Sequence, residues 1–182
     1  MDNNVKLIKT CNTARKVTKV VRIFSYVALA LFAFVTVALL IPGVINMDEM
    51  TVEHNMTGTE LAWGKGEMLA MLAATASVMV ISGLVMLMCE RVLTTVTDGG
   101  SPFVDENVSR IKSIAVLTAL GGVIPSFLSQ LVMLVYAIVN KTGADLVMEL
   151  EVSYLVMALV IWCVALIFEY GVTLQQRDDE TL

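Results

Sequence analysis

The feature that most constrains this chain is a long run of uncharged residues near its N-terminus. No charged side chain occurs between Arg22 and Asp48, and residues 23–45 are almost wholly apolar. A helix needs about 20 such residues to cross the ~30 Å hydrocarbon core of a bilayer. The run therefore predicts a membrane-spanning helix. It fits a cleaved signal peptide less well, because it exceeds the usual apolar region of roughly 7–15 residues and no small-residue cleavage site follows.

Three further apolar runs, at about residues 68–89, 113–139 and 152–168, predict three more spans. Of the 182 residues, 57% are hydrophobic and the mean hydropathy is +0.80, whereas soluble domains are roughly 45–50% apolar. Lipid offers no partners to backbone groups, so spanning segments of this length are helices. We expect an all-α, up-and-down four-helix bundle (residues 23–168), preceded by a basic amphipathic segment (1–22) and followed by a tail (169–182).

The distribution of Lys and Arg predicts the orientation of the spans. Ten of the 12 basic residues lie in the N-terminal segment, the loop after the second span and the C-terminal tail, whereas the opposite loops carry only Lys65 and Lys141. Loops rich in Lys and Arg stay on the cytoplasmic side. We therefore expect a multi-pass protein of the cell membrane with both termini in the cytoplasm.

The spans themselves contain no Asp, Glu, Lys, Arg or His. Proton relays and ion pathways are usually built from such residues, so the pattern argues against a pump or an ion-coupled transporter. The third span has Gly121, Gly122 and Pro125 followed by Ser126, Ser129 and Gln130. This stretch predicts a kink with a polar lining, which fits either helix packing or a ligand cavity. Small residues on the second span predict that it lies inside the bundle.

No pattern of catalytic or metal-ligating residues is recognisable. Cys11, Cys89 and Cys163 are widely separated, and the acidic first outer loop with His54 matches no ligand spacing. We therefore predict no catalytic residue, metal site or cofactor, and expect that the protein is not an enzyme.

Two segments outside the spans are amphipathic. Leu7, Cys11, Ala14, Val17 and Val21 recur at helical spacing, and basic residues occupy the other faces. We interpret this as a helix that rests on anionic lipid headgroups and leads into the first span, in preference to a nucleic-acid-binding segment. In the middle loop, Ser101 as N-cap and Pro102 at the first helical position predict a helix that starts before the membrane.

The middle loop and the tail also carry a recognisable combination of short motifs. Gly-Ser-Pro-Phe (100–103), Glu-Asn-Val (106–108) and Arg-Ile-Lys (110–112) precede the third span, and Phe168-x-Tyr-Gly-x-x-Leu-Gln175 and Asp-Glu-Thr-Leu (179–182) follow the fourth. The combination resembles a bacterial membrane-protein family catalogued as domain of unknown function 2975. Two residues depart from that pattern: Glu169 stands where a basic residue is expected, and Arg177 where an acidic one is expected.

The resemblance implies a partner, because members of that family are commonly encoded beside a very small helix-turn-helix regulator. It implies a non-enzymatic, regulatory membrane protein that docks such a partner. The juxtamembrane position of the basic segment separately leads us to expect no direct contact between this chain and nucleic acid. The residues expected to form the docking surface are Pro102, Phe103, Asn107, Arg110, Tyr170, Gly171, Leu174, Gln175, Asp179 and Thr181. For these two segments, the alternative is that both only cap helices at the membrane interface. A small transporter or channel component is the alternative, and the small-residue faces leave open a homo-oligomer.

Overall fold

Five helices and two short strands make up the computed structural model, which describes residues 2–41, 51–53, 60–62, 64–98, 101–141 and 151–180. The elements are α1 (Asp2–Leu40), β1 (Thr51–Glu53), β2 (Glu60–Ala62), α2 (Lys65–Thr97), α3 (Asp105–Gly121), α4 (Ile124–Asn140) and α5 (Val152–Glu180). The strands form an antiparallel pair between α1 and α2 in sequence, with Val52 opposite Leu61. His54 and the last residues of the first predicted span, 42–45, lie outside the described residues.

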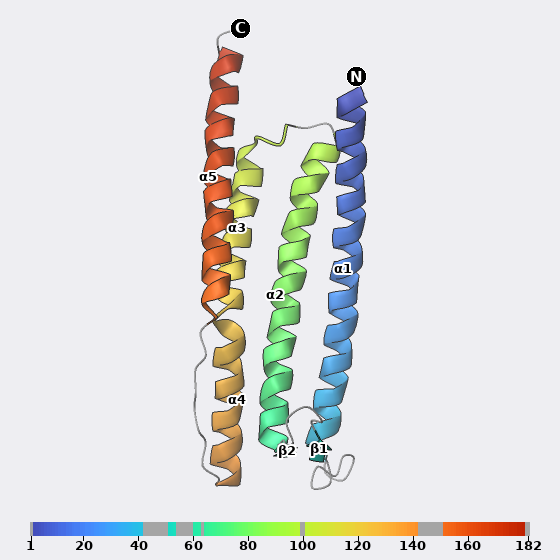
Figure 1. The fold of residues 1–182 in the computed structure, drawn as a ribbon, viewed down its shortest axis with the longest axis vertical. Coiled ribbons are helices and arrows are strands. Elements are labelled where there is room, and N and C mark those ends of the chain that lie inside the picture. The colour runs from blue at the N-terminus through green and yellow to red at the C-terminus, as the bar shows by residue number, and fades with distance from the viewer. Residues whose placement is uncertain are drawn as a thin grey trace.

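Four helical segments are long and apolar enough to cross a membrane: α1, α2, the α3–α4 pair and α5. Figure 1 shows them running up and down in the order α5, α3–α4, α2, α1. The prediction of an all-α, four-helix fold of the membrane type is confirmed. Both termini and the α2–α3 connection lie at one end, called the terminal end below, and the β1–β2 hairpin lies at the other.

Helix α2 occupies the interior of this arrangement, as its small residues predict. It packs against α1, α3 and α4. Ala70 and Gly83 are buried, and a Cβ added to Gly83 would lie 3.4 Å from the Tyr26 ring of α1. Small residues allow this close approach, which supplies packing energy where lipid removes most of the hydrophobic driving force between helices.

The third span is broken where the sequence predicts a kink. Helix α3 ends at Gly121, Gly122 and Val123 form a turn, and α4 begins at Ile124 with Pro125 in its first turn. Proline has no N–H to donate and clashes with the preceding turn of a continuous helix, so a new helix start is the position it tolerates best. The third span therefore consists of two separate helices placed end to end (Figure 1).

Helix α5 begins at the level of this break and runs beside α3 towards the terminal end (Figure 1). A Cβ on Gly122 would lie 2.8 Å from Cβ of Tyr154 and 3.2 Å from the Glu151 carbonyl oxygen, so the absence of a side chain lets the two helices meet. The stripe of α5 that faces α3 includes Ala158, Ala165 and Val172, all buried. The far end of α5 projects beyond the start of α3 (Figure 1).

The basic N-terminal segment does not form a separate helix on the membrane surface. Helix α1 continues from it into the first span without interruption. Its basic residues Arg15, Lys19 and Arg22 contact α2, whereas Val17 and Val21 of the predicted apolar stripe are exposed. The prediction of a surface-lying amphipathic helix is therefore wrong in its orientation, because ion pairs with α2 hold the segment upright.

Candidate docking site at the terminal end

The middle-loop motif and the start of the tail motif pack directly against each other. The rings of Phe103 and Phe168 lie 5.4 Å apart, at an interplanar angle of 44°. Phe103 also covers Gly171, where a Cβ would overlap its ring. Tilted aromatic pairs at this distance stabilise beyond their buried area, by about 0.5–1.5 kcal/mol. Glycine at position 171 is therefore what allows the ring to lie against the backbone of α5.

Polar bonds flank this aromatic contact on both sides. The Ser101 hydroxyl donates to Oε1 of Gln175 at 2.6 Å, and Lys112 Nζ lies 3.0 Å from Oε2 of Glu169. Glu169, one of the two residues that depart from the pattern of the resembled family, thus has a basic partner on α3. Together these contacts join residues 101–112 and 168–175 into one unit, which we call the α3–α5 platform.

Two of the predicted docking residues shape the platform from within. Asn107 is fully buried, donates through Nδ2 to the Pro102 carbonyl at 3.1 Å and accepts from Arg110 Nη1 at 3.0 Å. Arg110 also donates to the Thr95 hydroxyl at 2.9 Å and pairs with Glu106 at 2.8 Å. A buried amide with both ends bonded fixes its surroundings, so Asn107 holds the 101–104 segment onto α3.

The start of α3 differs from the prediction. The helix begins at Asp105 with Val104 as N-cap, not at Pro102 with Ser101 as N-cap. The Ser101 hydroxyl accepts from the Phe103 N–H at 3.1 Å while it donates to Gln175. A tertiary contact with α5 therefore takes the place of the local cap that the sequence favours.

The predicted docking residues fall into two groups. Pro102, Phe103, Asn107, Arg110, Gly171 and Gln175 are engaged inside the platform through the contacts above. Tyr170 and Leu174 are exposed, with 65% and 45% of their surface accessible. The side chain of Asp179 and all of Thr181 lie outside the described parts of the chain.

A second polar network at the same end links α1 to α2, and sequence reasoning missed it. Glu90 lies 2.8 Å from Arg22 Nη1 and 3.4 Å from Lys19 Nζ, and only 12% of its side chain is exposed. Arg15 Nη1 reaches the Thr97 hydroxyl at 3.5 Å. Arg22 and Glu90 are the charges that border the apolar runs of α1 and α2, as Lys112 and Glu169 are for α3 and α5. At the end of its apolar run that faces the terminal end, each of these helices therefore forms an ion pair with its neighbour.

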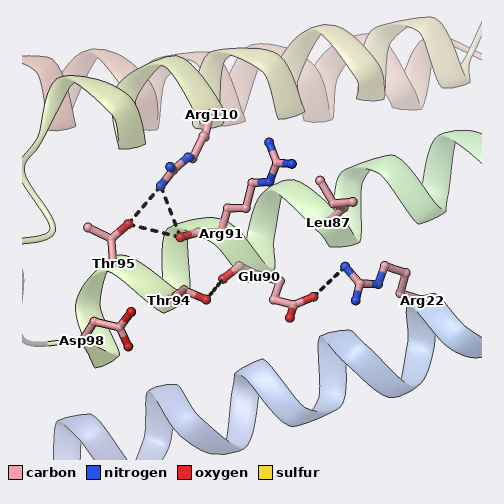
Figure 2. Close-up of a pocket in the computed structure, with 8 residues that line it drawn as sticks. All are labelled: Arg22, Leu87, Glu90, Arg91, Thr94, Thr95, Asp98 and Arg110. Atoms are coloured by element: carbon pink, nitrogen blue, oxygen red, sulfur yellow. Dashed lines mark hydrogen bonds and ion pairs between the residues drawn. The ribbon is translucent and has the colours of Figure 1, made fainter.

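A pocket of about 360 Å³ opens beside this network, between α1, α2 and α3. Figure 2 shows arginines from all three helices around it: Arg22, Arg91 and Arg110. Glu90 and Asp98 bring two carboxylates to the same lining. The pocket thus presents both signs of charge, with one more cation than anion.

A different pocket, of about 430 Å³, lies beside the α3–α4 break. Its lining includes the predicted polar stripe, Ser126, Ser129 and Gln130, together with Glu151, which directly precedes α5, and Tyr154 in the first turn of α5. The stripe is therefore the wall of a pocket halfway along the third span, and it faces α2 and α5.

No protein-family model, curated protein or solved structure matches the chain. These comparisons neither support nor oppose the resemblance to domain of unknown function 2975, which stays a prediction.

Proposed function

We propose that this protein is a non-enzymatic, regulatory membrane protein that docks a partner on its α3–α5 platform, with the terminal end in the cytoplasm. The observation that carries the proposal is the platform itself. Two motifs more than 50 residues apart in sequence pair through Phe103 and Gly171, Ser101 and Gln175, and Lys112 and Glu169. Such a rigid base would present the rest of α5 to a partner at low entropic cost.

The surface left for a partner is the outer face of α5 beyond Glu169. Tyr170 and Leu174 are exposed there, as are Thr173, Gln176, Arg177, Asp178 and Glu180. Leu174 lies past Glu169, the residue that ends the apolar run of α5, so lipid chains would not cover its apolar side chain. Leu174 therefore favours a protein contact. Tyr170 lies next to Glu169, where a headgroup contact would suit it equally.

The chemistry of the tail fits a basic partner. After Gln176 the chain reads Arg-Asp-Asp-Glu-Thr-Leu, with one basic and three acidic side chains. DNA-binding regulators carry a basic surface, and opposite charge on the two faces speeds their association. The helix-turn-helix regulator implied by the resemblance has this character. The Lys and Arg bias that favours a cytoplasmic terminal end would place the tail where such a regulator is found.

Replacing Leu174 with Glu should reduce capture of the partner at least tenfold. The experiment is affinity purification of the tagged full-length protein from its native membrane, with mass spectrometric quantification of co-purified small helix-turn-helix proteins. A second variant lacks residues 175–182 and should behave in the same way. Thr173→Ala is the matched control, since Thr173 is exposed at the same height and, among the residues that the structure describes, its hydroxyl bonds only to the Glu169 carbonyl. Equal recovery with Leu174→Glu and wild type would contradict the proposal.

The pocket beside the α3–α4 break favours a second candidate function, a small transporter or channel component. It adds a carboxylate, Glu151, to the polar side chains of the third span, and an ionisable group at this depth is a functional-site hypothesis by default. Solute flux in liposomes that falls with Gln130→Leu, while thermal stability is unchanged, would support transport. Docking without any flux would favour the first candidate.

A further inference from the structure

Within the part of the chain that the structure describes, the three-helix pocket at the terminal end contains an arginine whose guanidinium has no partner. Among the described residues, the Arg91 guanidinium forms no hydrogen bond or ion pair, and the side chains of Thr95 and Arg110 bond to the Arg91 backbone oxygen instead. Figure 2 shows no dashed line to its nitrogens, in contrast to Arg22, which meets Glu90, and Arg110, which meets Thr95. The pocket therefore combines one uncommitted guanidinium with a second, Arg110, which its bonds to Thr95, Asn107 and Glu106 hold in place.

The pocket borders the apolar runs of α1 and α2, the level at which a bilayer would place its phospholipid headgroups. Arg22 is the last charged residue before the apolar run of α1, and Glu90 and Arg91 are the first after that of α2. Leu87, one turn deeper on α2, lines the side of the pocket towards the apolar layer. A volume of about 360 Å³ is large enough for a headgroup phosphate with its substituent.

Arginine is suited to phosphate, because its planar donors match two phosphate oxygens at once. Basic pockets between membrane helices are typical sites for lipid phosphates. Neither Glu90 nor Glu106 adds an unpaired negative charge, because Arg22 and Lys19 pair with Glu90 and Arg110 pairs with Glu106. Asp98 adds an uncompensated negative charge to the lining. It is exposed, and within the described chain its carboxylate has neither a hydrogen bond nor an ion pair.

We propose that this pocket binds the headgroup of a phospholipid that carries an ammonium group, such as phosphatidylethanolamine. Its phosphate lies against Arg91 and Arg110, and its ammonium lies against Asp98. A headgroup with both charges satisfies both signs in the lining, whereas a purely anionic headgroup would leave the carboxylate of Asp98 beside another negative charge. The proposal does not depend on partner docking.

The test is native mass spectrometry of the purified full-length protein with phosphatidylethanolamine and phosphatidylglycerol added in equal amounts. Arg91→Gln should lower occupancy by phosphatidylethanolamine about tenfold, as expected for loss of a charged hydrogen bond. Lys16→Gln is the matched control, since Lys16 is an exposed basic residue of α1 at the same end. Asp98→Asn should shift the preference towards phosphatidylglycerol.

Each outcome decides one part of the proposal. Equal occupancy with Arg91→Gln and Lys16→Gln would overturn the site. Loss with Arg91→Gln but no change of preference with Asp98→Asn would overturn the ammonium assignment. Inorganic phosphate and glycerophosphoethanolamine are the soluble competitors: displacement of the lipid by millimolar inorganic phosphate would show a site for free phosphate and overturn the lipid as its source. Unchanged melting temperatures of the variants establish that the losses are local.

Discussion

Replacing Glu90 with Gln is expected to lower the free energy of unfolding by about 2–3 kcal/mol. Removal of one partner from a buried ion pair costs roughly 3–5 kcal/mol, because the other charge stays behind without compensation. Glu90 balances two cations, Arg22 and Lys19, and is only 12% exposed. The expected loss of unfolding free energy lies below that range because 25% of the Arg22 side chain and 45% of the Lys19 side chain reach solvent, which can stabilise the charges left behind.

The measurement is equilibrium unfolding of the purified protein in a mild detergent, followed by circular dichroism. Glu106→Gln is the matched control: it removes the same charge from an ion pair at the same end, but Glu106 is 78% exposed. Exposed pairs contribute about 0–1 kcal/mol, so this variant should be close to wild type. The double variant Arg22→Gln/Glu90→Gln should lose less unfolding free energy than the two single variants lose together. Equal losses of unfolding free energy for Glu90→Gln and Glu106→Gln would contradict the inference that ion pairing holds α1 to α2.

The number and composition of the spans could be predicted from sequence because they are local properties. Each apolar run is long enough by itself to demand a helix in lipid, and Pro125 after two glycines predicts the position of the break. The small residues of α2 also predict its interior place. None of these inferences requires knowledge of which helix lies beside which.

What the sequence could not supply is the axial position of one helix against another. Hydropathy places the start of α5 at Val152 but does not show that it lies beside Gly122, halfway along the third span. The same limit applies to the network around Glu90. Arg22 and Glu90 stand at the borders of neighbouring runs, and a search for opposite charges at such borders, given the four-span topology, would have paired them.

The predicted N-cap at Ser101 failed for a related reason. A local cap contributes about 1 kcal/mol, and here the same hydroxyl bonds to Gln175, 74 residues away. The Phe103 contacts with Phe168 and Gly171 pull the segment towards α5 at the same time. Local propensity was therefore overruled by a tertiary contact that only the folded chain contains.

The second large effect is expected at Gly171, where valine should destabilise the protein by about 1–3 kcal/mol and detach residues 101–104 from α5. Any Cβ at this position would overlap the Phe103 ring, and a β-branched side chain adds more atoms to the same space. Gly83→Ala is the matched control within another helix. Its Cβ would meet the Tyr26 ring at an ordinary 3.4 Å, and alanine favours helix by about 1 kcal/mol over glycine.

A compensating change separates this clash from a general intolerance of α5 to substitution. Phe103→Ala removes the ring that the new side chain would meet, so the double variant Phe103→Ala/Gly171→Val should be more stable than the two separate losses predict, by about 1 kcal/mol or more. Additive losses would contradict the packing of Phe103 on Gly171. If the α3–α5 platform is also the docking base, Gly171→Val should lose the partner and the double variant should not regain it, because Phe103 is then missing from the platform. Stability and docking would thereby respond differently to the same pair of substitutions.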